Sequence, residues 1–168
     1  MLMLILGSVN ANLNTDLEVY YNFDETSGTT LTDSVGSKDG TASAGDILDS
    51  SAGILGTSGN FIGTDSDNII YDGTIVTDYP FTHNAWIKSN NGAGQIMGLI
   101  NKGANTEYSN ILLQASQFAE AQSYFGGSNG KATYSVDIAD NAWHMITGLF
   151  ISDTNRCVAV DGLIRICE

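Results

Sequence analysis

The chain has 168 residues, with 6 Lys and Arg against 19 Asp and Glu, and a formal net charge of −13 at pH 7. This balance argues against nucleic-acid binding, which needs clustered basic residues, and against attachment to an anionic membrane surface. A hydrophobic content of 42% is enough for a packed core, and 19 glycines spread along the chain predict many tight turns in a globular domain.

The chain opens with the apolar segment Met1–Leu6, part of a lead-in over residues 1–15. Six apolar residues fall far short of the roughly 20 that span a bilayer, and no basic region precedes them as in a secretory signal. The segment predicts a short strand or a docking segment, with a clipped signal remnant ending near Ala11 as the alternative. We expect no membrane insertion.

Residues 16–168 predict one domain built of strands. Leu17, Val19 and Tyr21 alternate with polar neighbours, which is typical of a half-buried strand. The predicted strands, bounded mostly by Gly, Asn, Asp or Ser, cover 17–23, 81–88, 95–100, 108–114, 131–138, 143–151 and 156–167. Residues 114–122 favour a helix by propensity, but their flanks resemble strand ends, so we expect a hairpin there. Residues 26–59 predict ordered loops with short strands, and the whole pattern predicts a β-sandwich or jelly roll.

Several segments carry a family resemblance. Residues 18–41 combine an aromatic strand, an acidic Ser-Gly turn and an Asp-Gly-Thr loop. Further segments follow in order: Gly53–Gly56, Phe61–Gly63, Asp65–Ile69, Phe81–Lys88, Ala142–Met145 and Val158–Gly162. In register over residues 18–166, they resemble the laminin G-like domains of the concanavalin A-like lectin and glucanase family. The resemblance implies an all-β, antiparallel β-sandwich jelly roll.

Members of that family continue past the hairpin that matches Val158–Gly162. The resemblance therefore implies that C-terminal strands are missing and that a sheet edge lies unpaired beside residues 17–23, a feature that proteins normally cover. Met1–Leu6 or a partner chain would fill this place, or the sequence is a fragment. A homo-oligomer or an assembly partner that completes the sheet edge is one expected partner.

The last predicted hairpin places its apolar residues on one core face: Val158, Val160, Ile164 and Ile166. To keep these residues of both strands on one face, the loop around Asp161-Gly162 must have an odd number of residues, as in a type I turn with a glycine bulge. It also puts Cys157 and Cys167 on one outward face, directly opposite or one step diagonal. Directly opposite cysteines suit a disulfide, which fits an extracellular or virion setting. Two unpaired thiols are the alternative.

Catalytic motifs are absent from the sequence. Glycoside hydrolases with this jelly roll carry a Glu-x-Asp-x-x-Glu run that sets two carboxylates ~5 Å apart, whereas the glutamates here are isolated from one another. His83 and His144 lie far apart, without the spacing of a zinc site, and are interpreted as structural. We expect no enzyme.

Oxygen-rich loops predict Ca²⁺ as a possible cofactor, because Ca²⁺ prefers carboxylate and carbonyl ligands. The candidate ligands are Asp33 and Asp39 in one loop, Asp65 and Asp67 in a second, and Glu107 and Asn110 in a third. The last pair is carried over from the calcium-dependent pentraxin relatives. Solvated turn residues are the alternative interpretation for each loop.

An aromatic platform beside polar groups is the usual requirement for sugar binding. Trp86 alternates with the apolar residues of its strand and lies beside Asn84, so it is a candidate to stack on a sugar. Tyr108 and Tyr124 are expected to join this site. Alternatively, Trp86 covers the second side of the sheet. Trp143 is predicted to belong to the core.

The leading functional hypothesis is a non-catalytic recognition or adhesion module for a glycan or a surface protein, with Ca²⁺ as a possible cofactor. The alternative is a virion decoration or surface-assembly subunit that uses the jelly roll for packing. A glucanase-like hydrolase is the weaker third hypothesis. All three predict a location outside the cell, at the cell surface or on a virion.

Overall fold

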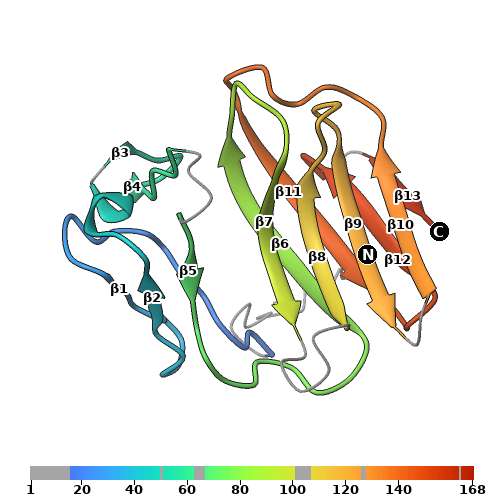
Figure 1. Ribbon diagram of the computed structural model, residues 1–168, viewed down its shortest axis with the longest axis horizontal. Coiled ribbons are helices and arrows are strands. Elements are labelled where there is room, and N and C mark those ends of the chain that lie inside the picture. Colours follow the sequence, from blue (N-terminus) through green and yellow to red (C-terminus); the bar gives the residue numbers. More distant parts are fainter. Residues whose placement is uncertain (1–15, 50, 63–66, 101–106, 126–127, 163) are drawn as a thin grey trace, which may run out of the picture. The chain divides into compact units, whose positions relative to one another are not determined.

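The computed structural model describes residues 16–49, 51–62, 67–100, 107–125, 128–162 and 164–168 (Figure 1). Its regular structure is antiparallel strands and one short 3-10 helix, so the predicted all-β class is confirmed. The contacts divide the chain into two compact units, Met1–Ile75 and Val76–Glu168, where the sequence predicted one domain. Each unit is described by itself.

The first unit contains short strands joined by turns, as the composition of residues 26–59 predicted. Its elements are β1 (Thr30–Leu31), β2 (Gly40–Ala42), the 3-10 helix η1 (Gly45–Leu48), β3 (Ser51–Ala52), β4 (Thr57–Ser58) and β5 (Ile69–Ile70). β1, β2 and β5 form a three-stranded sheet, and β3 pairs with β4. Leu31, Ala42, Ile47 and Leu48 form the small core of this unit.

The predicted strand over residues 17–23 is wrong. Only Tyr21 forms an isolated β-bridge, to Asp33. Phe23 has a φ of +59°, which interrupts an extended strand. Polar side chains hold this segment instead, because Asp33 accepts the backbone N–H of Tyr20 and Thr57 donates to the carbonyl of Phe23. Leu17 remains 41% exposed and does not join a core.

The second unit is a sandwich of two four-stranded antiparallel sheets, drawn one behind the other in Figure 1. Its strands are β6 (Phe81–Lys88), β7 (Gly94–Ile100), β8 (Tyr108–Leu113), β9 (Ala119–Phe125), β10 (Ser128–Tyr134), β11 (Trp143–Phe150), β12 (Arg156–Val160) and β13 (Ile164–Cys167). One sheet has the order β10-β9-β8-β7 and the other β13-β12-β11-β6. The β-sandwich prediction is confirmed; jelly-roll connectivity stays a prediction.

The two sheets bury alternate residues against each other, which is the period that sheet packing demands. Buried residues of β8, β9 and β10 pack with buried residues of β11 and β12: Ile111, Leu113, Ala119, Ala121, Ala132, Ile146, Phe150, Val158 and Val160. We call the opposite side of each sheet its outer face. Trp143 is paired with Lys88 and, by strand parity, lies on the outer face, so its prediction as a core residue is wrong.

Residues 114–122 form a hairpin and not a helix, as the flanking strands predicted. The backbone N–H of Gln114 donates to the carbonyl of Phe118 at 3.0 Å, and Gln117 takes a φ of +67° in the turn. β9 then starts at Ala119, whose side chain is fully buried. Burial in the sandwich therefore overrides the helix propensity of this stretch.

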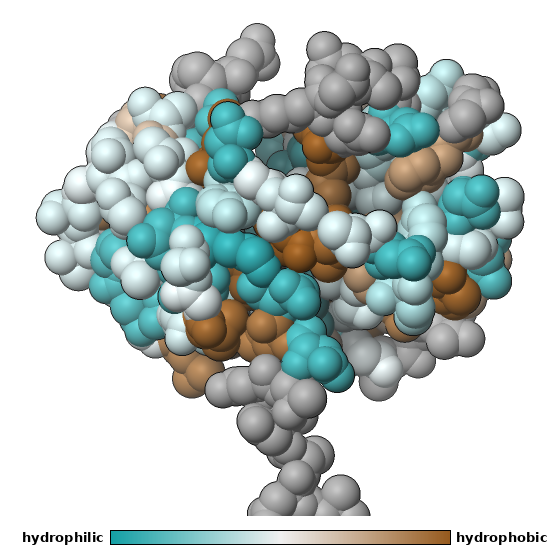
Figure 2. Space-filling model, turned by 90° about the horizontal axis from the view of Figure 1, so that it is seen from below, coloured by the Kyte–Doolittle hydropathy of each residue, from teal (hydrophilic) through white to brown (hydrophobic). Residues whose placement is uncertain are grey.

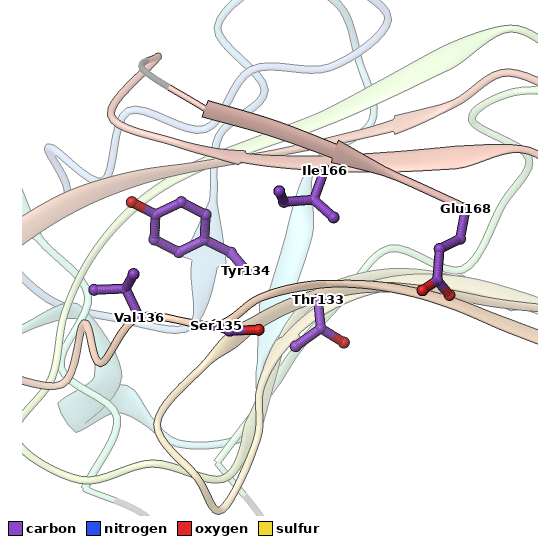
Figure 3. A pocket seen from close by; sticks show the side chains of 6 residues that line it. All are labelled: Thr133, Tyr134, Ser135, Val136, Ile166 and Glu168. Atoms are coloured by element: carbon purple, nitrogen blue, oxygen red, sulfur yellow. The ribbon is translucent and has the colours of Figure 1, made fainter.

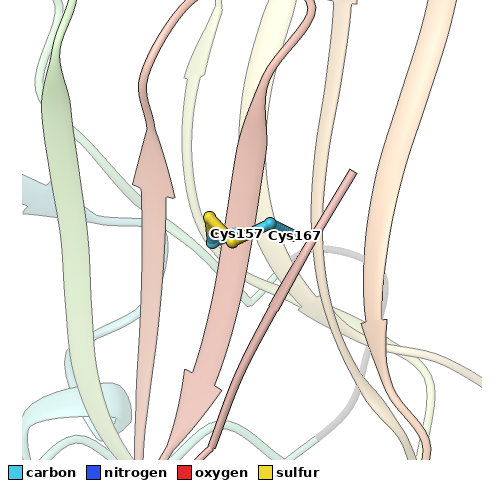
Figure 4. The surroundings of a disulfide bond; sticks show 2 residues. All are labelled: Cys157 and Cys167. Carbon is cyan, nitrogen blue, oxygen red and sulfur yellow. A yellow bond between two sulfur atoms is a disulfide. The ribbon is translucent and has the colours of Figure 1, made fainter.

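Cys157 and Cys167 lie directly opposite each other in the β12–β13 pair and form a disulfide with a Cα–Cα distance of 4.0 Å (Figure 4). The register pairs Val158 with Ile166, so the predicted parity is confirmed. Asp161 and Gly162, with φ values of 52° and 68°, lie between the two strands. The disulfide is on the outer face of its sheet, although Cys157 itself is fully buried.

Candidate functional site

The outer face of β6 and β11 carries the most exposed aromatic side chain of the sandwich strands. Trp86 is 47% exposed and lies directly opposite Met145 in the neighbouring strand. Asn84, two residues along β6, lies opposite Thr147, and its Nδ2 donates to Thr147 Oγ1 at 3.3 Å. The predicted neighbours Trp86 and Asn84 therefore share a surface.

Trp143 adds a second indole to this surface. It is two residues before Met145 in β11, and Met145 is the direct partner of Trp86. Diagonal neighbours of this kind lie ~7–8 Å apart in an antiparallel pair. The sequence analysis did not predict that Trp143 lies near Trp86. A signal was present: Ile146 and Phe150 are core residues, and Trp143 is an odd number of residues from each, which places its indole on the outer face. We call the surface formed by Asn84, Trp86, Trp143, Met145 and Thr147 the indole face.

Tyr108 and Tyr124 are not part of the indole face. They are direct partners in β8 and β9, and their rings stack with centroids 5.8 Å apart and planes at 18°. By strand parity they lie opposite the buried Ile111 and Ala121, on the outer face of the other sheet. The prediction that they join Trp86 in one site is wrong, because the outer faces of a sandwich point in opposite directions.

Asn110 and Glu107 were predicted as calcium ligands. Glu107 directly precedes β8, and Asn110 is a buried residue within it, on the same outer face as Tyr108. No group of three or more His, Cys, Asp or Glu side chains that could hold a metal ion occurs among the described residues. Binding of Ca²⁺ stays a prediction.

Asp33, the buried calcium candidate of the first unit, is surrounded by backbone donors. Its Oδ1 accepts the N–H of Tyr20 at 3.1 Å, and its Oδ2 accepts the N–H of Lys38 at 3.1 Å. Burial acts to raise the pKa of Asp33, but these backbone donors outweigh it and hold the pKa below its ordinary value. Asp39 supports the same loop, since its Oδ1 accepts the N–H of Asp33 at 2.9 Å.

Only part of the second predicted calcium loop lies among the described residues. Asp65 lies outside the described residues. Asp67 is described, and its Oδ2 accepts the backbone N–H of Ile62 at 2.9 Å. This hydrogen bond links Asp67 to Ile62, the described residues on either side of 63–66.

His83 is buried in the sandwich with 5% of its surface exposed. The centroid of its ring lies 5.5 Å from that of Phe81 and 5.1 Å from that of Phe150, and neither ring nitrogen has a hydrogen-bond partner among the described residues. Burial lowers the pKa of His83 to about 4, so the imidazole is neutral at pH 7. Its packing agrees with the structural role that the sequence predicted.

His144 lies between two carboxylates at one end of the same unit. Its Nδ1 is 2.8 Å from Asp161 Oδ2, and its Nε2 is 3.1 Å from Asp140 Oδ1. Carboxylates only accept hydrogen bonds, so both contacts are satisfied when the imidazole carries two protons. Burial acts to lower the pKa of His144, but the bonds to Asp161 and Asp140 outweigh it and raise the pKa above its ordinary value.

We expect Asp161→Asn to destabilise the protein more at pH 5.5 than at pH 8.5. The pKa of His144 is higher in the folded protein than in the unfolded chain. The ion pair therefore stabilises the protein fully at a pH below the pKa of the unfolded chain, and this stabilisation is lost as the pH rises through the pKa of the folded protein. The difference is expected to be a few tenths to about 1 kcal/mol, as for other partly exposed ion pairs. Urea unfolding at both pH values measures it, and equal effects at the two pH values would contradict the ion pair. Asparagine keeps an acceptor for the N–H of Met145, which Asp161 binds at 2.9 Å.

A shallow groove of about 470 Å³ lies between the ends of β10 and β13 (Figure 3). It is lined by Thr133, Tyr134, Ser135, Val136, Ile166 and Glu168. Val136 and Ile166 are 53% and 38% exposed. Apolar residues are interspersed with hydrophilic ones elsewhere on the surface too, as Figure 2 shows for one face. The one aromatic side chain of this groove, Tyr134, is less exposed than Trp86, so we take the indole face as the candidate site.

No family model and no curated protein matches the chain. Among solved structures, it is similar to residues 221–444 of an S-layer domain-containing protein from Clostridium thermocellum, with a TM-score of 0.60 and 19% identity. The match covers 86% of this chain and 68% of the other. At this identity the likeness shows the fold alone. No helix among the described residues is long and apolar enough to cross a membrane.

Proposed function

We propose that this protein is a non-catalytic recognition module that binds a glycan through the indole face. The observation that carries the proposal is the 47% exposure of Trp86 beside the hydrogen-bonded pair Asn84 and Thr147. An indole offers a large apolar face at small entropic cost, and amide and hydroxyl groups at its edge orient sugar hydroxyls. Trp143 extends the platform along β11.

The net negative charge of the protein makes anionic ligands unfavourable. The net charge of −13 opposes ligands rich in carboxylate, sulfate or phosphate, because like charges repel over about 8 Å at physiological salt. We therefore expect a neutral glycan. The disulfide between Cys157 and Cys167 favours an oxidising compartment, which supports a location outside the cell or at its surface.

Glycan-array binding by the full chain, followed by calorimetry on the best neutral glycan, tests this function. Trp86→Ala is expected to weaken the binding at the indole face at least tenfold, which corresponds to about 1.4 kcal/mol, with little change in Tm. Leu55→Ala is the matched control, because Leu55 is a large apolar residue that is 84% exposed in the first unit. The function is wrong if no glycan binds, or if Trp86→Ala leaves every bound glycan within twofold of wild type.

A calcium requirement belongs to the same proposal and is tested separately. Binding that is lost in EDTA and restored by Ca²⁺ supports it, and equal binding under both conditions rejects it. Hydrolysis of the bound glycan that disappears on a single Glu→Gln change would instead revive the glucanase hypothesis.

Surface assembly is the second candidate function. What supports it is the likeness in fold to a protein whose title describes it as S-layer domain-containing. Light scattering after size-exclusion chromatography distinguishes the two. Large regular oligomers without saturable glycan binding support assembly, whereas a monomer that binds glycan saturably supports recognition.

A further inference from the structure

The outer face of the β7–β10 sheet holds a buried carboxylate. Glu120 of β9 lies directly opposite Thr133 of β10 and Leu112 of β8, and only 2% of its surface is exposed. A buried charge is costly unless other groups pair with it or bind it. The Nζ of Lys131 lies 3.9 Å from Glu120 Oε2, so a cation stands beside the carboxylate.

One oxygen of this carboxylate binds a hydroxyl group and an amide group together. Thr133 Oγ1 donates to Glu120 Oε2 at 3.1 Å, and Gln114 Nε2 donates to the same oxygen. A carboxylate that accepts the proton of a hydroxyl is placed to act as a general base and to make that hydroxyl a nucleophile. Gln114, which directly follows β8, and Thr133 of β10 therefore meet at a single atom.

The carbonyl group of the Gln114 amide has a donor of its own. Ser116 Oγ donates to Gln114 Oε1 at 3.1 Å. A donor at this oxygen stabilises the negative charge that develops when a nucleophile attacks the amide carbon. The turn holds Gln114 in place, because its backbone N–H donates to the carbonyl of Phe118 at 3.0 Å and its carbonyl accepts the N–H of Gln117 at 2.8 Å. A nucleophile, a base, an amide and an oxyanion donor are thus assembled in one place.

We propose that Thr133 and Gln114 form an intramolecular ester, with Glu120 as the general base. Thr133 Oγ1 attacks Gln114 Cδ while Glu120 Oε2 takes the hydroxyl proton. The Cδ–Nε2 bond then breaks, Glu120 passes the proton to Nε2, and one molecule of ammonia leaves. The carboxylate returns to its starting state, so no oxidant, reductant or external substrate takes part. Gln114 and Thr133 are half-buried, which leaves the ammonia a way out to solvent.

The ester joins β10, an edge strand of its sheet, to the turn between β8 and β9. The disulfide joins β13, an edge strand of the other sheet, to β12. Each sheet then has one edge strand held by a covalent bond. The reaction is a single self-modification of each molecule, so it is compatible with a non-catalytic recognition module and does not depend on the indole face.

Mass spectrometry of the full chain, after reduction of the disulfide, tests the ester. The wild type is expected to be lighter than its sequence by the mass of one ammonia molecule. Trypsin cleavage after Lys131 places Gln114 and Thr133 in separate peptides, 103–131 and 132–156. These two peptides are expected to stay joined, and to separate on mild alkaline hydrolysis, which cleaves esters much faster than amides.

Thr133→Val is the decisive variant, because it keeps the shape of the side chain and removes the hydroxyl. It is expected to show its full sequence mass and two separate peptides. Thr133→Ser restores a hydroxyl and is expected to restore the ester, which a merely structural role of Thr133 does not require. Thr82→Val, at an exposed threonine of β6, is the matched control and is expected to lose ammonia as the wild type does.

The inference is overturned if the wild type shows its full sequence mass, or if Thr133→Val loses ammonia as the wild type does. Loss of ammonia without joined peptides also overturns it, because this marks cyclisation of an asparagine or glutamine elsewhere in the chain. A bond from Gln114 to Lys131 is recognised by the absence of trypsin cleavage at Lys131 and by resistance to alkali, and it equally excludes the ester.

Discussion

Lowering the pH from 7 to 4 is expected to destabilise the sandwich by about 3 kcal/mol through His83 alone. The folded-state pKa of His83 is about 4, against 6.5 for an exposed histidine. The unfolded chain therefore takes up a proton between these values, while the folded chain, with the His83 ring packed against Phe81 and Phe150, does not. Stability falls as the pH drops from 6.5 towards 4, at about 1.4 kcal/mol per pH unit.

Urea unfolding followed by tryptophan fluorescence measures this effect, because both tryptophans lie in the sandwich unit. His83→Leu is the control: it keeps an apolar contact with the phenylalanines and has no proton to take up. The stability of wild type relative to His83→Leu is expected to fall by about 3 kcal/mol between pH 7 and pH 4. A constant difference over this range would show that His83 is not held neutral by burial. Other groups, His144 included, titrate in both proteins and cancel in the comparison.

Removal of the disulfide is expected to destabilise the sandwich by about 3 kcal/mol. The bond joins residues separated by 10 positions, and closing a loop of that size removes this much entropy from the unfolded chain. The Cys157→Ala, Cys167→Ala double variant tests the value by urea unfolding. Reduction of the wild-type protein under the same conditions separates the loss of the bond from the small cavity that alanine leaves at the buried Cys157.

The two measurements for the disulfide are expected to agree to within about 1 kcal/mol, the cost of a cavity of one sulfur atom. If both the double variant and the reduced wild type lose less than about 1 kcal/mol of stability, other contacts hold β12 and β13 together. Val158 and Ile166, paired on the core face beside the disulfide, are the residues that would then carry the hairpin.

Alternation in the sequence was enough to predict which side of its strand each residue of β6 and of the β12–β13 hairpin occupies. The face of a strand follows from local geometry, since neighbouring side chains point to opposite sides. The same alternation placed Cys157 and Cys167 on one face, directly opposite or one step diagonal, and the register shows that they are directly opposite. For residues 17–23 the alternation misled, because Asp33 and Thr57, distant in sequence, bind that backbone and no strand forms.

A local sequence pattern does not show which strand pairs with which. Trp86 and Tyr108 both have the alternation of outward-facing residues. Because β6 pairs with β11 in one sheet and β8 with β9 in the other, the two side chains lie on opposite sides of the sandwich. The sequence by itself determined the all-β class, most of the strands and the shared face of Cys157 and Cys167, because these depend on neighbours within a few residues; that the two cysteines are direct partners and form a disulfide came from the structure. Only the tertiary structure brought Trp143 beside Trp86, since this depends on how strands far apart in the chain align when the core is buried.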